Sequence, residues 1–202
     1  STSTSGALLS AGTYYLAVGG FNTTFAGGFL ATSTSGSTGD IQVDLFTDLP
    51  AGGTAISGTC DLTDFGPDEA GRSAAWELLD SNGTVVESGT TALGGGGAYT
   101  VNVNATSGTY TFTMKASHWL KGGVENIVAG GPATANFALV NGDVDNDNEV
   151  GPGDFGALAT AFLSVDGDPN WNAEADLDGD GEVGPGDFGI LANNFLQAGY
   201  GA

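Results

Sequence analysis

Basic side chains are almost absent from this sequence. Three of its 202 residues are Lys or Arg, 24 are Asp or Glu, and the formal net charge is −21 at pH 7. Nucleic acids and anionic membrane surfaces are bound through basic patches, so we expect neither kind of partner. No apolar run approaches the ~20 residues that a membrane-spanning helix requires, so we also expect no membrane insertion.

Cysteine and histidine occur once each. Cys60 has no second cysteine with which to form an internal disulfide, and we expect it to be a small core residue. His118 stands next to Trp119 at the end of a predicted strand, where a packed histidine is more common than a catalytic base. The sequence therefore offers no nucleophile–base pair.

The sequence also lacks an initiator methionine and a signal peptide, so we expect a processed N-terminus or a segment of a longer chain. Its composition is rich in Ser, Thr and Gly and poor in Lys, with 36 glycines. Such a composition, together with the acidic loops described next, favours an extracellular or cell-surface location.

One pattern occurs twice near the C-terminus. GDVDNDNEVGPGDFGALATAF begins at Gly142 and DLDGDGEVGPGDFGILANNF begins at Asp176. Asp143 aligns with Asp176, so the offset between the two copies is 176 − 143 = 33 residues. The segment EVGPGDFG is identical in both copies. Carboxylates occupy positions 1, 3, 5 and 12 of each copy: Asp143, Asp145, Asp147 and Asp154, then Asp176, Asp178, Asp180 and Asp187.

This spacing is typical of a calcium-binding loop. Ca²⁺ takes roughly 6–8 oxygen ligands, and a 12-residue loop supplies them from positions 1, 3, 5, 7, 9 and 12. Position 7 contributes a backbone carbonyl, here that of Glu149 or Glu182. Position 6 requires a left-handed backbone, which suits Gly181 and is tolerated by Asn148. A solvated acidic linker is the alternative, but it would not keep two identical registers, so we predict two Ca²⁺ ions.

Paired carboxylates can also hydrolyse glycosides. The best-placed acids of this sequence are already needed for calcium, and we expect a protein that is not an enzyme.

Each acidic loop is followed by a short amphipathic segment. Its apolar residues recur at helical spacing and predict one helix per repeat. They are Phe155, Leu158, Ala159 and Phe162 in the first copy, and Phe188, Leu191, Ala192 and Phe195 in the second.

Two loop–helix units without an entering helix, with Asp instead of Glu at position 12, resemble a dockerin domain over roughly residues 141–200. The resemblance implies a small α-helical calcium-binding domain, which we place at 141–202, and a cohesin-like protein as a possible partner. It also implies ten metal ligands: Asp143, Asp145, Asp147, Glu149, Asp154, Asp176, Asp178, Asp180, Glu182 and Asp187.

Loop positions 10 and 11 depart from the family pattern. Cellulosomal dockerins typically carry hydroxyl residues there and basic residues later on the helix, and they use both to recognise a cohesin. Here the two pairs are Pro152–Gly153 and Pro185–Gly186, and neither predicted helix contains Lys or Arg. The resemblance thus extends to fold and calcium, and partner recognition does not carry over with it.

Residues 58–140 have the pattern of an antiparallel β-sandwich. Strands are predicted over 76–80, 84–88, 98–105, 109–116 and 136–140. Asn82–Gly83 is expected to form a type I′ hairpin turn. The segment resembles the carboxypeptidase-regulatory-like and immunoglobulin-like sandwiches of bacterial exported proteins, and residues 50–57 are expected to be a linker. The whole chain is thus expected to be mainly β, with the small α-helical domain at its end.

Residues 1–49 predict a short β meander, with strands over 12–21, 29–35 and 39–46. Three or four strands in fewer than 50 residues are too few for an independent sandwich, which takes about 100 residues. We therefore expect another segment or another subunit to complete the meander.

Three Asn-x-Ser/Thr sequons, at Asn22, Asn82 and Asn104, are candidate glycosylation sites.

Two functions remain open at this point. The favoured one is a calcium-stabilised structural subunit that forms a homopolymer or filament by β-strand addition between copies, because this would complete the meander. The alternative is a dockerin-type module that attaches an exported protein to a cohesin-like receptor.

Overall fold

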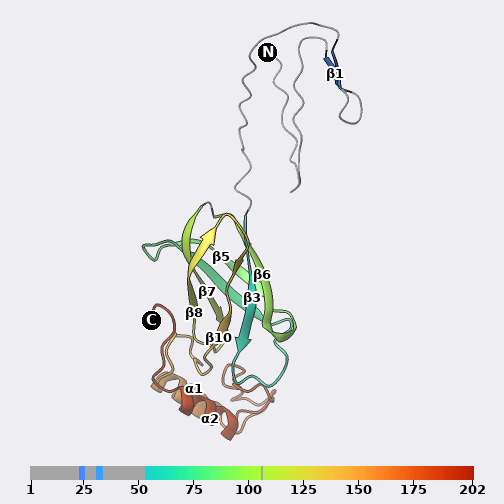
Figure 1. Cartoon of the computed structure of the whole chain (residues 1–202). Coiled ribbons are helices and arrows are strands. Elements are labelled where there is room, and N and C mark those ends of the chain that lie inside the picture. Colours follow the sequence, from blue (N-terminus) through green and yellow to red (C-terminus); the bar gives the residue numbers. More distant parts are fainter. Residues whose placement is uncertain (1–22, 26–30, 34–52, 106) are drawn as a thin grey trace. The chain divides into compact units, whose positions relative to one another are not determined.

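A computed structural model describes residues 23–25, 31–33, 53–105 and 107–202. The chain divides into two compact units, Ser1–Leu49 and Pro50–Ala202. In the first unit, β1 (Thr23–Phe25) pairs with β2 (Ala31–Ser33) in antiparallel register (Figure 1). β2 lies inside the strand expected at 29–35, and the strands expected at 12–21 and 39–46 lie outside the described residues.

The second unit begins with a sandwich of two sheets. Its strands are β3 (Thr54–Leu62), β4 (Ser73–Leu79), β5 (Val85–Ala92), β6 (Ala98–Val103), β7 (Gly108–Ala116), β8 (Gly122–Ala129), β9 (Ala133–Thr134) and β10 (Phe137–Leu139), with a 3₁₀ turn η1 (Gly95–Gly97) before β6. One sheet has the order β10-β3-β6, with β9 also paired to β3, and the other has the order β5-β4-β7-β8. The expected mainly-β fold with two C-terminal helices is confirmed.

Strand β3 begins at Thr54, so the second half of the segment expected to be a linker, 50–57, is a strand instead. A glycine inside that segment explains the difference. A Cβ on Gly53 would lie 2.6 Å from the carbonyl oxygen of Val103 in β6, so glycine lets the two backbones approach closely. β9 and β10 also run parallel to β3, whereas purely antiparallel pairing was expected.

The β4–β5 hairpin turn differs from the type I′ turn expected at Asn82–Gly83. Only Gly83 has a positive φ, of 76°, so one residue of the pair is left-handed instead of two. The carboxylate of Asp80 organises the turn, because its Oδ1 accepts hydrogen bonds of 2.9 Å from the backbone N–H groups of Asn82 and Thr84.

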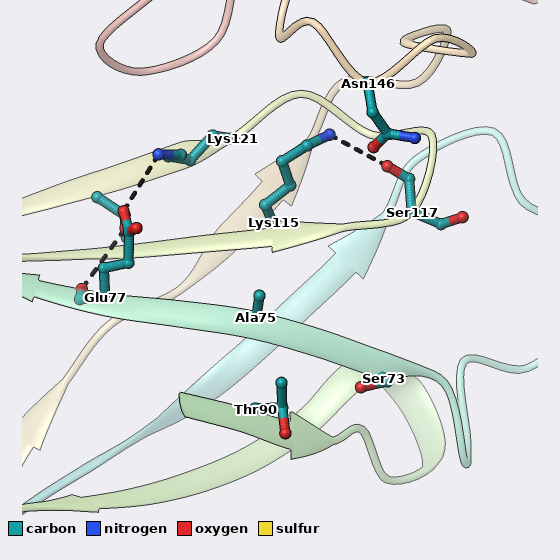
Figure 2. Close-up of a pocket in the computed structure, with 9 residues that line it drawn as sticks. Ser73, Ala75, Glu77, Thr90, Lys115, Ser117, Lys121 and Asn146 are labelled. Atoms are coloured by element: carbon teal, nitrogen blue, oxygen red, sulfur yellow. Dashed lines mark hydrogen bonds and ion pairs between the residues drawn. The ribbon is translucent and has the colours of Figure 1, made fainter. Parts of the chain in front are cut away.

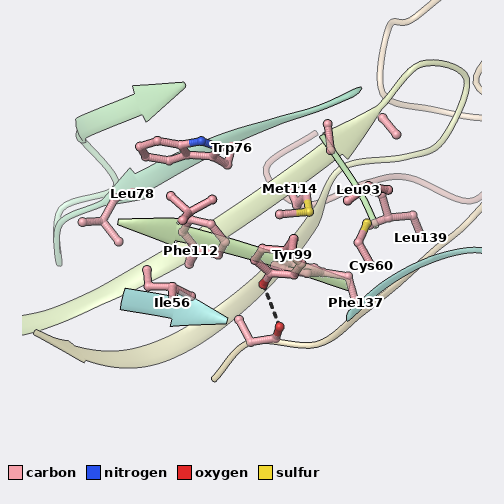
Figure 3. Close-up of a cluster of buried hydrophobic side chains, with 14 of the residues drawn as sticks. Ile56, Cys60, Trp76, Leu78, Leu93, Tyr99, Phe112, Met114, Phe137 and Leu139 are labelled. Carbon is pink, nitrogen blue, oxygen red and sulfur yellow. Dashed lines mark hydrogen bonds between the residues drawn. The ribbon is translucent and has the colours of Figure 1, made fainter. Parts of the chain in front are cut away.

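The sandwich core contains a group of packed aromatic rings (Figure 3). The ring of Phe112 stacks near Tyr99 and packs beside Trp76, with centroid distances of 6.2 and 5.9 Å. The hydroxyl of Tyr99 donates a 2.7 Å hydrogen bond to the carbonyl of Ala135, which satisfies this polar group inside the core. Cys60 is a buried free thiol in the same cluster, as expected, and burial raises its pKa to about 12.

Two helices, α1 (Pro152–Ala161) and α2 (Pro185–Asn194), lie at one end of the sandwich (Figure 1). Leu158 and Leu191 are each 1% exposed and belong to a second hydrophobic core. Phe155 and Phe188, expected on the same helix faces, stay 47% and 45% exposed. None of the helices in the described residues has the length and apolarity needed to cross a bilayer.

Candidate metal loops and exposed helix face

The first acidic loop brings three carboxylates together. One oxygen from each of Asp143, Asp145 and Asp154 lies within 4.8 Å of one from each of the others. Asp154 holds this arrangement at the start of α1. Its Oδ1 accepts the N–H of Asp145 at 3.0 Å, and its Oδ2 accepts the N–H of Gly151 at 2.6 Å. The position-12 aspartate therefore closes the loop and also accepts the N–H of the N-cap residue, Gly151, at the start of the helix.

The second loop repeats this arrangement with Asp176, Asp178 and Asp187. Oδ1 of Asp187 accepts N–H groups from Leu177 at 2.6 Å and Asp178 at 3.1 Å. Its Oδ2 accepts the N–H of Gly184 at 2.7 Å. The sequence repeat is thus a repeat of geometry.

Backbone conformation follows the sequence pattern at position 6. Asn148 and Gly181 have φ angles of 73° and 91°, the left-handed conformation expected there.

The Pro–Gly pairs at positions 10 and 11 have a local structural explanation. Pro152 is the first helical residue, where its fixed φ favours the helix start. A Cβ on Gly153 would lie 2.1 Å from Oδ2 of Asp145, and one on Gly186 would lie 2.5 Å from Oδ2 of Asp178. Glycine therefore leaves room for the position-3 carboxylate.

The two repeats are joined reciprocally. The N–H of Leu163, after α1, donates to the carbonyl of Val183 in the second loop at 2.7 Å. The N–H of Leu196, after α2, donates to the carbonyl of Val150 in the first loop at 2.8 Å. Each loop is therefore tied to the end of the other repeat's helix.

Two predicted carboxylate ligands lie outside the three-carboxylate groups. Asp147 and Asp180 accept, through Oδ1, the N–H groups of Glu149 and Glu182, both at 2.9 Å. The ten-residue ligand set, including the carbonyls of Glu149 and Glu182, stays a prediction.

The electrostatics of both loops favour a cation. Burial, followed by the charge of a neighbouring carboxylate, raises the pKa of Asp145, Asp176 and Asp178. Asp143 is fully buried, and its Oδ1 has no hydrogen-bond partner among the described residues. An all-oxygen, anionic donor set with an unpartnered carboxylate oxygen fits a hard divalent ion such as Ca²⁺.

The sandwich contacts both loops, which the sequence did not predict. Lys115 in β7 forms a 2.7 Å ion pair with Oδ2 of Asp143. The N–H of Gly66, in the loop after β3, donates to the carbonyl of Asp178 at 2.8 Å. The only sequence signal for these contacts was the rarity of basic residues. It drew attention to Lys115 but did not indicate which carboxylate Lys115 would pair with.

The outer face of the helix pair is apolar. In the described residues, seven of the ten exposed large hydrophobic side chains lie in this region: Phe155, Phe162, Leu163, Val165, Phe188, Phe195 and Leu196. The rings of Phe155 and Phe188 meet edge to face with centroids 6.2 Å apart, so the two repeats form one surface. They line a shallow cavity of about 350 Å³ with Leu158, Ala159 and Phe162. Such a patch is typical of an interaction surface.

The remaining candidates are placed as follows. His118 is 2% exposed, stacks on Trp119 with a centroid distance of 3.9 Å, and lies 3.5 Å from Oε2 of Glu174. Asn82 and Asn104 are exposed, and Asn22 lies outside the described residues. Glycosylation of these sequons stays a prediction.

Comparison with known proteins agrees with this geometry. Residues 141–196 match the dockerin type I domain family. Two solved structures match with TM-scores of 0.58 and 0.55, at 17% and 19% sequence identity. They are C-terminal and N-terminal interface mutants of a type II cohesin–X–dockerin complex from Acetivibrio cellulolyticus, and each match covers 72% of this chain and 97% of the other chain. None of the curated proteins compared with this sequence matches it.

The family match covers the duplicated loops and both helices, and the structural matches share the fold that precedes them. Residues 141–196 of this chain are therefore a dockerin domain, and it follows a β-sandwich.

Proposed function

We propose that this chain belongs to an extracellular or cell-surface protein, and that its dockerin domain holds two Ca²⁺ ions and binds a cohesin through the exposed face of α1 and α2. The observation that carries the proposal is the apolar surface around Phe155 and Phe188, on a domain of the dockerin family. The role is docking, not catalysis.

Calcium would be held in the two acidic loops. Asp143, Asp145 and Asp154 form the gathered carboxylates of the first, and Asp176, Asp178 and Asp187 those of the second. We add Asp147 and Asp180, and the backbone carbonyls of Glu149 and Glu182, to complete an oxygen shell of the size that Ca²⁺ requires. Bound calcium neutralises the carboxylates and thereby keeps both helices in place.

The character of the helix face indicates how a partner is bound. Phe155 and Phe188 are each about half exposed, and α1 and α2 contain no Lys or Arg. Binding would therefore rely on burial of apolar area, which stabilises a complex by about 1–2 kcal/mol per phenylalanine. The cohesin that fits this face presents an apolar surface in place of acceptors for hydroxyl and basic side chains.

Self-assembly into a filament was the favoured expectation from the sequence. It depended on residues 1–49, most of which lie outside the described residues. The family match and the cohesin complexes support the alternative instead, so docking to a cohesin is the function we propose.

Isothermal titration of the purified protein with purified type I and type II cohesins, in calcium-containing buffer, tests the proposal. We expect one class of cohesin to bind, and the Phe155→Ser/Phe188→Ser variant to bind it on the order of 100-fold more weakly. Val85→Thr/Val86→Thr, on exposed positions of β5, is the matched control and should bind normally.

Two results would overturn this function. One is the absence of binding to any cohesin of either class in calcium. The other is an affinity that the phenylalanine variant leaves unchanged. A molar mass from light scattering that rises with protein concentration, without cohesin binding, would favour self-assembly instead.

A further inference from the structure

Lys115 is held in a fixed position beside the first acidic loop. Its Nζ donates to the carbonyl oxygens of Ser117 at 3.1 Å and Trp119 at 2.8 Å, and to Oδ2 of Asp143 at 2.7 Å. Figure 2 shows its side chain pointing from β7 toward the turn at Ser117, with Asn146 of the acidic loop nearby. The three acceptors fill the donor capacity of an ammonium group, so the charge cannot move away freely.

The two oxygens of Asp143 have different surroundings. Oδ2 accepts from Lys115 and, at 3.2 Å, from the N–H of Asn148. Oδ1 is buried and has no hydrogen-bond partner among the described residues. A cation in the loop would therefore use Oδ1, and the ammonium would stand on the other side of the same carboxylate.

In the part of the chain that the structure describes, no ammonium group pairs with a carboxylate of the second loop. Both oxygens of Asp176 accept backbone N–H groups, from Gly179 at 3.0 Å and Gly181 at 3.1 Å. In the described residues, the other two basic residues form no ion pair with a loop carboxylate. Arg72 lies over the ring of Phe65 at 3.9 Å, and Lys121 pairs with Glu77 at 3.1 Å.

From this asymmetry we infer that Lys115 is a built-in part of the first calcium site, through which the β-sandwich lowers the calcium affinity of that site alone. The inference rests on the proposed calcium binding. A fixed positive charge one carboxylate away from a divalent cation opposes its entry. The same charge offsets repulsion among the loop carboxylates when calcium is absent, so it keeps the empty loop folded against the sandwich.

Site-resolved calcium titration by ¹⁵N–¹H correlation NMR tests this inference. The backbone amides of Asn148 and Gly181 are equivalent positions of the two loops and report each site separately. In Lys115→Met we expect the calcium dissociation constant at the Asn148 reporter to fall on the order of tenfold, with the Gly181 reporter unchanged. Without calcium, the same variant should unfold at a lower temperature than wild type.

Matched variants separate charge from packing. Lys121→Met removes the neighbouring lysine, which touches no loop carboxylate, and should leave both reporters as in wild type. Lys115→Arg keeps the charge and should keep the affinity close to wild type. Lys115→Gln is a second neutral variant, which should tighten the first site as Lys115→Met does.

The outcomes distinguish the two proposals. If neither reporter responds to calcium in wild type, the proposed calcium binding fails. If both respond, but neutral variants leave the first site unchanged, weaken it, or tighten both sites equally, the role of Lys115 is wrong. A lysine with a purely structural role would weaken the first site when removed, so the sign of the change decides.

Discussion

Phe65 lies directly over Gly179, so closely that a Cβ on this glycine would come within 2.2 Å of Cε2 of the ring. Phe65 follows β3 in the sandwich, and Gly179 is position 4 of the second acidic loop. The first loop has Asn146 at position 4, with a φ of 63° against 74° for Gly179. The backbone conformation is therefore the same, and the glycine is required by the contact with Phe65.

Gly179→Asn places the residue of the first repeat into the second. We expect it to lower the free energy of unfolding by about 1–3 kcal/mol, because the Phe65 ring must move to admit the side chain. Asn146→Gly is the reciprocal control and should change stability by less than about 1 kcal/mol. Urea denaturation of the full chain measures both.

The Phe65→Ala background supplies the check. Phe65→Ala should be destabilising by itself, but Gly179→Asn should cost little more once the ring is absent. Equal costs of Gly179→Asn in both backgrounds would show that the glycine is needed for another reason.

Removal of calcium should weaken the sandwich as well as the dockerin domain. Each bound ion contributes about 2.7 kcal/mol when free calcium is 100-fold above its dissociation constant. Gly66 and Lys115 join the sandwich to the two loops, so we expect a shared unfolding transition. The Trp171→Phe variant makes this measurable, because its tryptophan fluorescence comes only from Trp76 and Trp119, which are buried in the sandwich core.

In that variant, excess chelator should lower the melting temperature reported by tryptophan emission by several degrees. A sandwich transition that keeps its midpoint when calcium is removed would contradict the coupling.

The sequence predicted the parts of the site that local spacing determines. The grouping of the carboxylates at positions 1, 3 and 12 of each loop followed from their spacing, and so did the left-handed residue at position 6. Their role as metal ligands stays a prediction. Lys115 and Gly66 could not be found in this way. Lys115 is separated from Asp143 by 28 residues and Gly66 from Asp178 by 112, and nothing local encodes those pairings.

Two predictions, the extent of the linker and the burial of the helix residues, failed because both depend on tertiary packing. Gly53 was expected in a linker because close backbone approach has no sequence signature of its own. The apolar faces of both helices were predicted correctly as stripes. The period could not tell that Leu158 would be buried and Phe155 exposed, since that depends on how the two helices pack together.

Alkaline pH should destabilise the protein through Cys60. Burial raises the pKa of this thiol from 9.0 to about 12, so the unfolded chain loses its proton first as the pH rises. Stability is therefore retained below pH 9 and falls above it, by about 1.4 kcal/mol for each pH unit. The buried Tyr99 hydroxyl, whose pKa is raised from 10.0, adds to the loss only above pH 10.

Urea denaturation between pH 8 and pH 10 measures this slope. Cys60→Ala should be less stable at neutral pH but should lose the dependence between pH 9 and pH 10. An unchanged slope in Cys60→Ala would assign the alkaline loss to other groups.

The left-handed backbone conformation of Leu196 should lower the stability of the protein, while its side chain adds to the exposed apolar surface. It follows α2 with a φ of 68° and an exposed fraction of 80%, and Leu163 repeats this after α1 with 62° and 68%. A left-handed leucine is disfavoured by about 1–2 kcal/mol, and glycine is the usual residue at such a helix end. We therefore expect Leu196→Gly to raise the free energy of unfolding by about 0.5–1 kcal/mol, after the larger chain entropy of glycine is subtracted.

Leu196→Ala removes the same side chain but keeps the Cβ, so it should not stabilise the protein. If Leu196 belongs to the cohesin-binding face, both variants should weaken binding in calorimetric titrations, whereas only the glycine variant gains stability. Equal stabilisation of both variants would mean that the exposed side chain of Leu196, and not its backbone conformation, destabilises the protein.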